Sequence, residues 1–525
     1  MVNAVRSGSG AEVIARGQPD DGEPLSARAV STCIPGLGRI AARHLSAFAL
    51  RHRRSGTQRS GLGRSAGRCR PKLLAIPAAR PDGIRQFALS AAFFLCRNEL
   101  LVSPEDLIED GLLCSEDCAG TSFCPTAVDY AAVMPFKRRV FEAAWGNFAA
   151  GRRADLRHVF DDFCEREAPW PEDYALFRAL KVKWEGANYL EWPVELVERS
   201  PVALSTARRE LAETIAQVRF AQFLLCRQGG RLKEYANSKG VRLIGDLPFY
   251  VAGDSCEVWT DPGLFKLDER HRARFVGGVP PDYFSALGQL WGNPVYDWDA
   301  IRATGYRWCI DRFRALLAYV DMIRLDHFRA FAAAWHVPAG AASAQSGEWV
   351  PGPGAELFAA VATGLGALPF IAEDLGLITD DVQALRDRFQ LPGMRVLQFA
   401  FDGNGDNTHD NPTTRGWFEE LPDWQKQYVW GYLRRAPGDN GEIAAALMKL
   451  AWSSPAALAI APLQDVLNLG NEARMNLPGR ADGNWRWRCT DEMLVRASFD
   501  LLRDLTRDSG RAFAQPIQLE NETTQ

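Results

Sequence analysis

The stretch Met322-Ile323-Arg324-Leu325-Asp326 is a short apolar run that ends on a carboxylate side chain. Its length and apolar content are typical of a buried strand in a parallel sheet. Four other runs have the same form and end on or near an acid: 243–246, 370–373, 396–402 and 458–465. Enzymes of the (β/α)₈ barrel class present catalytic groups at the carboxyl ends of their strands. The pattern therefore predicts a barrel with an acid-lined mouth, although any α/β protein can carry acids at strand ends.

Composition excludes several classes of protein. The 525 residues allow one barrel with insertions or two to three domains, and the net charge of -4 gives no sign of a nucleic-acid or membrane-surface partner. No apolar stretch approaches the roughly 18 residues that span a bilayer. The cysteines form no regular framework, and the cluster Cys114, Cys118 and Cys124 lacks a nearby His, so we expect reduced thiols, a cytoplasmic protein and no metal site.

Residues 1–97 differ in composition and periodicity from the rest of the chain. They hold 15 Arg and one Lys against five acids, and stretches such as 51–56 and 64–70 show neither helical nor strand periodicity. A transit peptide, a disordered basic arm and translation in the wrong reading frame are three interpretations. We favour the third, because GC-rich DNA read out of frame yields Arg, Ala, Gly, Ser and Pro.

An ordinary globular sequence begins at Asn98. Residues 98–240 form the start of this region, and from 126 onward they are mainly helical in pattern, with a long helical stretch from 205 that ends at Gly240. From residue 241 to 525 strand-like and helical segments alternate, which is the order of a parallel α/β barrel. We therefore expect a catalytic barrel over 241–525 preceded by a helical insertion.

Seven motifs, in order along the chain, carry a family resemblance. They are Ile244-Gly245-Asp246-Leu247-Pro248-Phe249-Tyr250-Val251-Ala252, Gly278-Val279-Pro280-Pro281-Asp282-Tyr283-Phe284-Ser285, Leu290-Trp291-Gly292-Asn293-Pro294, Arg324-Leu325-Asp326-His327-Phe328-Arg329, Ala372-Glu373-Asp374-Leu375-Gly376, Thr408-His409-Asp410-Asn411 and Glu472-Ala473-Arg474-Met475-Asn476. Together they resemble the amylomaltases, the 4-alpha-glucanotransferase (disproportionating enzyme) branch of the alpha-amylase superfamily. The resemblance covers roughly residues 98–515.

The resemblance implies three catalytic carboxylates. Retaining cleavage of a glycosidic bond uses two carboxyl groups about 5–5.5 Å apart. Asp326 would be the nucleophile and Glu373 would be the acid/base. Asp410 would bind ring hydroxyls of the sugar in the transition state. Arg324 lies two residues before Asp326 on the same strand face, where its charge would keep Asp326 ionised and aligned.

The resemblance also implies a set of substrate-binding residues. Asp246 would lie beside the donor site, with His327 and His409 as neighbouring hydrogen-bond donors. A Gly- and Pro-rich loop would close over the acceptor sugars and displace water, which favours transfer over hydrolysis. The remaining expected substrate contacts are Asp282, Tyr283, Phe284, Ser285, Trp291 and Asn293. The implied partners are maltooligosaccharides and α-1,4-glucans, with no metal or organic cofactor.

Two departures from the family pattern bear on activity. The opening barrel strands have no recognisable counterpart in residues 1–97. The motif 408–411 should follow an apolar strand, but here it follows the turn-forming residues 402–407, so strand 7 is not recognisable. Asp410 would then lack rigid support. Competing hypotheses are an α-1,4-glucan hydrolase, an inactive glucan-binding protein, and a misfolded product of a damaged gene.

Overall fold

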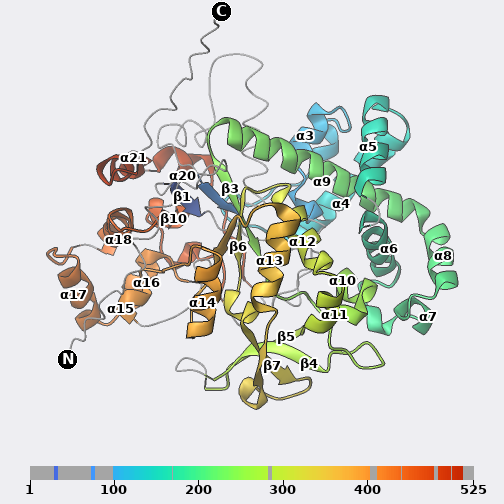
Figure 1. Cartoon of the computed structure of the whole chain (residues 1–525). Helices are drawn as coiled ribbons and strands as arrows, with labels where there is room; N and C mark the ends of the chain where they lie inside the picture. Colours follow the sequence, from blue (N-terminus) through green and yellow to red (C-terminus); the bar gives the residue numbers. More distant parts are fainter. Residues whose placement is uncertain are drawn as a thin grey trace, which may run out of the picture.

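The computed structural model describes residues 29–33, 73–76, 98–167, 170–281, 286–402, 411–438, 440–477, 483–497 and 499–511. Its main sheet has six strands, all parallel, in the order β10-β1-β2-β3-β6-β9. The strands are β1 (Ala29–Cys33), β2 (Leu73–Ile76), β3 (Arg242–Leu247), β6 (Met322–Leu325), β9 (Phe370–Ala372) and β10 (Leu458–Pro462). Every residue of β6 and β9 is buried, as expected for strands covered on both faces. The fold is therefore α/β, with a parallel sheet at its centre (Figure 1).

Four of the five predicted strand runs are confirmed as β3, β6, β9 and β10. The prediction for 396–402 is wrong, because Phe399–Asp402 is the short helix α15. In that segment the N–H groups of Ala400 and Phe401 donate to carbonyls three residues back. No described strand lies beside it, so these turn bonds satisfy backbone groups that a neighbouring strand would otherwise pair.

Two short strands lie within residues 1–97, where the sequence shows no recognisable counterpart of the opening barrel strands. β1 pairs with β10 and β2, and β2 in turn pairs with β3. Sequence periodicity could not identify them, because runs of four or five residues carry little pattern by themselves. The interpretation of 1–97 as a frame-shifted or disordered segment stays a prediction.

The helical region expected before residue 241 is confirmed. Its long helix α9 (Ala212–Ser238) runs without a break through the Gly229-Gly230 pair, and Gly240 follows it with a left-handed φ of 70°. Figure 1 shows this region on one side of the sheet and α14–α18 on the other. The helices before β3 are α3 (Pro104–Glu109), α4 (Tyr130–Ala149), α5 (Ala154–Glu167), α6 (Trp170–Lys183), α7 (Val194–Val197), α8 (Pro201–Glu210) and α9.

The helices after β3 alternate with strands up to β9, as the sequence predicted, but no described strand separates α14 to α18 or follows β10. They are α10 (Cys256–Thr260), α11 (Trp298–Ala303), α12 (Arg307–Leu317), α13 (Gly354–Leu365), α14 (Asp380–Arg388), α15, α16 (Thr414–Glu420), α17 (Asp423–Tyr432), α18 (Ile443–Trp452), α19 (Leu463–Val466), α20 (Asp491–Arg496) and α21 (Phe499–Asp508). Within the described part of the chain, each helix is too short or too polar to cross a bilayer.

A small antiparallel sheet is inserted between the parallel strands. Its order is β5 (Gln289–Pro294), β4 (Phe275–Val279), β7 (Ala333–Pro338) and β8 (Glu348–Pro351). β7 begins a few residues after β6, and β4 and β5 both lie between β3 and β6 in the chain. The insertion therefore follows the carboxyl ends of β3, which carries the predicted substrate-binding residue Asp246, and of β6, which precedes the predicted nucleophile Asp326.

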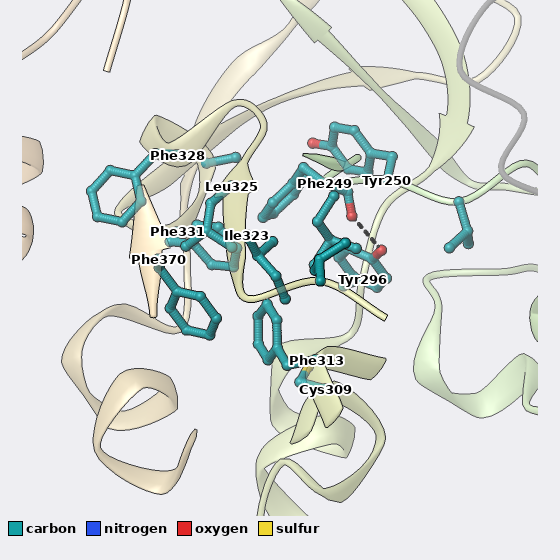
Figure 2. Close-up of a cluster of buried hydrophobic side chains, with 14 of the residues drawn as sticks. Phe249, Tyr250, Tyr296, Cys309, Phe313, Ile323, Leu325, Phe328, Phe331 and Phe370 are labelled. Atoms are coloured by element: carbon teal, nitrogen blue, oxygen red, sulfur yellow. Dashed lines mark hydrogen bonds between the residues drawn. The ribbon is translucent and has the colours of Figure 1, made fainter. Parts of the chain in front are cut away.

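The main core holds the ends of these strands in place. Ile323 and Leu325 of β6 are buried beside Phe370 of β9 (Figure 2), and the Phe370 ring lies 4.8 Å from the ring of Phe313 on α12. Burial of each such side chain contributes about 1.5–3 kcal/mol to folding. The Tyr296 hydroxyl, which is buried in this core, donates a hydrogen bond to the Phe249 carbonyl at 2.6 Å. The loops beyond the strands thus start from a rigid base.

Candidate active site

Arg324 joins the two neighbouring strands β3 and β6. Strand register sets Asp246 directly opposite Arg324, so both side chains project from the same face of the sheet. The guanidinium donates from Nε to Oδ1 of Asp246 at 2.7 Å and from Nη2 to Oδ2 at 3.1 Å. Nη2 also donates to Oδ1 of Asp326 at 2.7 Å. One buried cation thus fixes two carboxylates, as the sequence predicted for Asp326.

Asp326 and Glu373 follow directly on β6 and β9. The Asp326 N–H donates to the Leu247 carbonyl at 3.0 Å, which continues the β3–β6 ladder by one residue. The Glu373 N–H donates to the Leu325 carbonyl at 3.1 Å in the same manner on the other side of β6. Both acids are therefore held at the carboxyl end of the sheet by strand hydrogen bonds, which give a more rigid position than a loop would.

The Glu373 carboxylate is held by main-chain donors. Oε2 accepts from the His327 N–H at 2.7 Å, and Oε1 accepts from the Leu375 N–H at 3.1 Å. The Glu373 carbonyl also accepts from the Phe328 N–H at 3.1 Å. The turn after Asp326 and the turn after Glu373 are thereby tied together, and the acid/base candidate cannot move independently of the nucleophile candidate.

The electrostatics of the two carboxyls differ. Burial, together with the negative charge of Asp326, raises the pKa of Glu373 to about 8, although Arg324 and the two N–H donors oppose the rise. Burial lowers the pKa of Arg324, but the adjacent Asp246 and Asp326 outweigh it and the pKa ends above its usual value. At neutral pH Glu373 therefore carries a proton and Arg324 stays charged. The site thus holds one carboxylic acid, Glu373, and one carboxylate that is paired with a cation, Asp326.

His327 lies between these acids and the antiparallel sheet. Its backbone is left-handed, with a φ of 52°, and its ring lies edge-on to Trp291 at 4.9 Å. Burial, with a further contribution from Arg329, lowers the pKa of His327 to about 4, so the ring is neutral at pH 7. Its Nε2 atom is buried and has no hydrogen-bond partner within the described residues. A neutral imidazole with an unused nitrogen is suited to bind a sugar hydroxyl.

The structure brings most of the described site residues together. Asp246, Arg324, Asp326, His327 and Glu373 form one connected cluster, with Trp291 at its edge. Asn293 has a structural contact, because its Nδ2 donates to the Val251 carbonyl at 2.8 Å and the residue is 2% exposed. The predicted residues Asp282, Tyr283, Phe284, Ser285, His409 and Asp410 lie outside the described residues.

Sequence reasoning assigned no role to two residues that support this cluster. Arg329 donates from Nη1 to the Leu377 carbonyl at 2.9 Å and lies 3.7 Å from the centre of the Trp349 ring. Asp374 is buried and accepts from Arg386 at 2.6 Å and from the Met394 N–H at 2.6 Å. Both anchor the chain that follows Glu373. Charged residues within or beside a motif were a signal for them, but their partners lie too far along the chain to be inferred.

Comparison with known proteins gives the same family as the sequence motifs. A family model described as 4-alpha-glucanotransferase matches residues 88–494. The chain belongs to the 4-alpha-glucanotransferase family. It is 44% identical over 427 residues to the 4-alpha-glucanotransferase of Synechocystis sp., which is 76% of this chain and 84% of that protein. The enzyme of the same name from Thermus thermophilus is 43% identical over 415 residues, 74% of this chain and 82% of that protein.

A solved structure adds evidence for the fold. The amylomaltase from Streptococcus agalactiae in complex with acarbose matches with a TM-score of 0.82 and 32% identity, over 93% of this chain and 100% of that chain. The resemblance read from the motifs is thus confirmed, and the family is one of transferases, which supports transfer over hydrolysis.

Proposed function

We propose that this chain transfers α-1,4-glucan segments between maltooligosaccharides by a retaining double displacement. The observation that carries the proposal is the pair formed by Asp326, which accepts a hydrogen bond from Arg324, and the buried Glu373, whose pKa is raised to about 8 by burial and by the charge of Asp326. A retaining mechanism needs one ionised carboxylate and one carboxylic acid on the two sides of the scissile bond.

In the first step an Asp326 carboxylate oxygen attacks the anomeric carbon of the donor glucan. Glu373 gives its proton to the glycosidic oxygen, so the leaving segment departs as a neutral alcohol. In the second step a hydroxyl of the acceptor glucan attacks the anomeric carbon of the ester, Asp326 leaves as a carboxylate, and Glu373 takes the proton of the hydroxyl. Two inversions restore the α configuration, and the chemistry requires no metal or organic cofactor.

The other predicted residues complete this mechanism. Asp246 shares Arg324 with the nucleophile and would bind the donor sugar, while His327 and Trp291 would contact its hydroxyls and ring. Asp410 with His409 would bind ring hydroxyls in the distorted transition state. The 282–285 loop would cover the acceptor sites and exclude water, which would otherwise compete as the acceptor.

We also propose a (β/α)₈ barrel as the scaffold. The support is the pairing of β10 with β1, which are the last and the first of the described strands in sequence, since a barrel closes by joining its end strands. A cytoplasmic location is supported by the eight cysteines whose side chains the structure describes, all of which are free thiols.

Incubation of the full chain with maltotriose, followed by separation of the products by size, tests the function. Transfer yields glucose together with chains longer than maltotriose. Products that are all shorter than maltotriose would show a hydrolase instead. Absence of turnover in a folded protein would contradict the proposal and favour an inactive glucan-binding protein. The matched control is Asp326→Asn, which should give no products.

A further inference from the structure

Asp374 is a buried carboxylate that the mechanism above does not use. It follows the acid/base candidate Glu373 directly in the chain, and its side chain is only 2% exposed. The Glu373 carboxylate accepts from main-chain groups in the turns after β6 and β9, whereas the Asp374 carboxylate turns to helix α14. A buried carboxylate is costly unless it is paired and hydrogen-bonded, so the partners of Asp374 indicate what it does.

The partners of Asp374 come from two separate parts of the chain. Its Oδ2 accepts from Nη1 of Arg386 on α14 at 2.6 Å, and its Oδ1 accepts from the Met394 N–H at 2.6 Å. Arg395 adds a contact from Nη1 to Oδ2 at 3.3 Å, but its side chain is 77% exposed. We call the arrangement of Asp374, Arg386 and Met394 the Asp374 clamp. It fixes both α14 and the chain that follows this helix to the residue beside Glu373.

The chain held by the clamp lies along β9 and comes very close to the carboxylate. The Ala372 N–H donates to the Pro392 carbonyl at 2.8 Å, so this chain continues the hydrogen bonding of the sheet beyond β9. At the next residue, Gly393, a Cβ atom would lie 2.5 Å from Oδ2 and 2.7 Å from Oδ1 of Asp374. Any side chain at this position would therefore displace the carboxylate.

The clamp also determines the packing of Met394. This partly buried side chain packs against three buried residues of β3, β6 and β9, which are Ile244, Met322 and Ile371. Each of the three lies two residues before a member of the candidate active site, respectively Asp246, Arg324 and Glu373. Side chains two residues apart on a strand project from the same face of the sheet. Met394 thus packs against the layer of side chains that adjoins the active-site residues.

Asp374 lies between the two main-chain groups that hold Glu373. On one side the Glu373 N–H donates to the Leu325 carbonyl at 3.1 Å, and on the other side the Leu375 N–H donates to Oε1 of the Glu373 carboxylate at 3.1 Å. The Leu375 N–H belongs to the peptide unit that begins at Asp374. A rotation of the Asp374 backbone would therefore carry this donor away from the Glu373 carboxylate, and a buried side chain held from two sides opposes that rotation.

We propose that Asp374, through the clamp, is the positioning residue of Glu373. It fixes the peptide unit between residues 374 and 375 and the packing of Met394, so that the Glu373 carboxyl stays in place to protonate the glycosidic oxygen. Asp374 itself neither touches the substrate nor transfers a proton. The inference rests on the proposed function and adds to it that proton donation depends on contacts made outside the active site.

Two substrates separate a loss of positioning from a loss of folding. Departure of a glucan segment requires the proton of Glu373, whereas fluoride leaves a glucosyl fluoride without it. Asp374→Asn keeps the size of the side chain but cannot accept from both Arg386 and the Met394 N–H as the two carboxylate oxygens do. We expect the rate on maltotriose per folded molecule to fall about 10- to 100-fold, while fluoride release in the first turnover changes by less than about twofold.

A second variant reaches the same contact from the other side. Gly393→Ala displaces the carboxylate by steric contact and should show the same selective loss. The double variant should lose no more than the larger of the two single losses, because both changes act on one contact. Asp387→Ala is the control for the first variant, since Asp387 is a 65% exposed partner of the same Arg386. Gly431→Ala is the control for the second, since a Cβ atom there would meet no atom within 4 Å. Both controls should leave both rates unaltered.

Two results would overturn the proposal. An equal loss on maltotriose and on the glucosyl fluoride in Asp374→Asn and Gly393→Ala would show that the clamp supports the fold as a whole and not the acid. An unchanged rate on maltotriose in both variants would show that the position of Glu373 does not depend on the clamp. Disproportionation of maltotriose by the unsubstituted chain tests the proposed function separately.

A titration tests the clamp even if the unsubstituted chain forms no lengthened products. The infrared band of the Glu373 carboxyl is identified by its absence in Glu373→Gln and followed against pH. In Gly393→Ala, loss of the Leu375 N–H bond should move the titration of Glu373 to higher pH, because that bond stabilises the ionised form. The variant leaves the neighbouring charged groups unchanged, which are Asp326 and Arg324 in the site and Asp374 and Arg386 in the clamp. A titration at the same pH as in the unsubstituted chain would overturn the positioning role.

Discussion

Asp326, after β6, and Asp465, after β10, follow sequence runs of the same kind, yet their carboxylates have different neighbours. Asp326 accepts from the Arg324 guanidinium and lies near the acid Glu373. Asp465 is fully buried and accepts from the Thr414 N–H at 2.9 Å and from its hydroxyl at 2.6 Å. The first carboxylate lies beside a cation and an acid, as a nucleophile requires, whereas the second carboxylate holds the start of α16. We therefore expect the catalytic role at the acid whose neighbours supply a cation and a second carboxyl.

The largest effect should come from Asp326→Asn. Loss of the nucleophile removes the covalent step, so maltotriose turnover should fall by at least about 10³-fold. The amide can still accept from Arg324, and we expect the fold to persist. Steady-state rates together with a thermal unfolding curve check both points. Turnover close to that of the unsubstituted chain would remove Asp326 from the mechanism.

The next effect should come from Glu373→Gln. Without a proton donor the rate on maltotriose should fall by about 10²–10⁴-fold. A glucosyl fluoride needs no protonation to leave, so the variant should form the covalent ester from it at a nearly normal rate. Comparison of the two substrates in the same variant is the measurement. An equal loss on both would show that Glu373 is not the acid.

Arg324→Lys should have an intermediate effect. A lysine is a single point charge and cannot make the paired contacts to Asp246 and Asp326 that the planar guanidinium makes. We expect a loss of roughly 10²-fold in kcat, because small displacements of a reacting group are this costly. The comparable change at Arg208, an exposed partner of Asp173, is the control and should leave the rate unaltered.

The pH dependence should follow Glu373. Because its pKa rises from 4.5 to about 8 in the folded protein, the acid form falls away above about pH 8 and kcat/KM should drop with it. The folded state also holds this proton more tightly than the unfolded chain. The free energy of unfolding should therefore decrease as pH rises from about 4.5 to about 8. Both dependences should vanish in Glu373→Gln, and their persistence there would assign them to another group.

The smallest effect on rate should come from Asp465→Ala. The substitution leaves the buried Thr414 N–H without its acceptor, which should lower the free energy of unfolding by about 1–3 kcal/mol. Turnover per folded molecule should fall far less than in Asp326→Asn. Denaturant unfolding and rate measurement on the same sample check the contrast. A loss of turnover as large as that of the nucleophile variant would break the comparison between the two acids.

The sequence was sufficient to predict those parts of the structure that a local residue pattern determines. The apolar runs at β3, β6, β9 and β10 predicted strands, and period-two alternation placed Arg324 and Asp326 on one side. It failed for residues 396–402, because a strand also needs a neighbour that the run itself does not encode. It could not assign Asp465 a structural role, because the partner Thr414 lies 51 residues earlier. The short strands β1 and β2 likewise depend on pairing partners far along the chain.

The most direct measurement is to trap the covalent intermediate. Glu373→Gln is incubated with a glucosyl fluoride, digested and analysed by peptide mass spectrometry. The mechanism predicts one added glucosyl unit on the peptide that contains Asp326, and no addition when Asp326→Asn is also present. Label on a peptide that contains Asp246 or Asp465 instead, or no label while the fluoride is consumed, would contradict the assignment of Asp326 as the nucleophile.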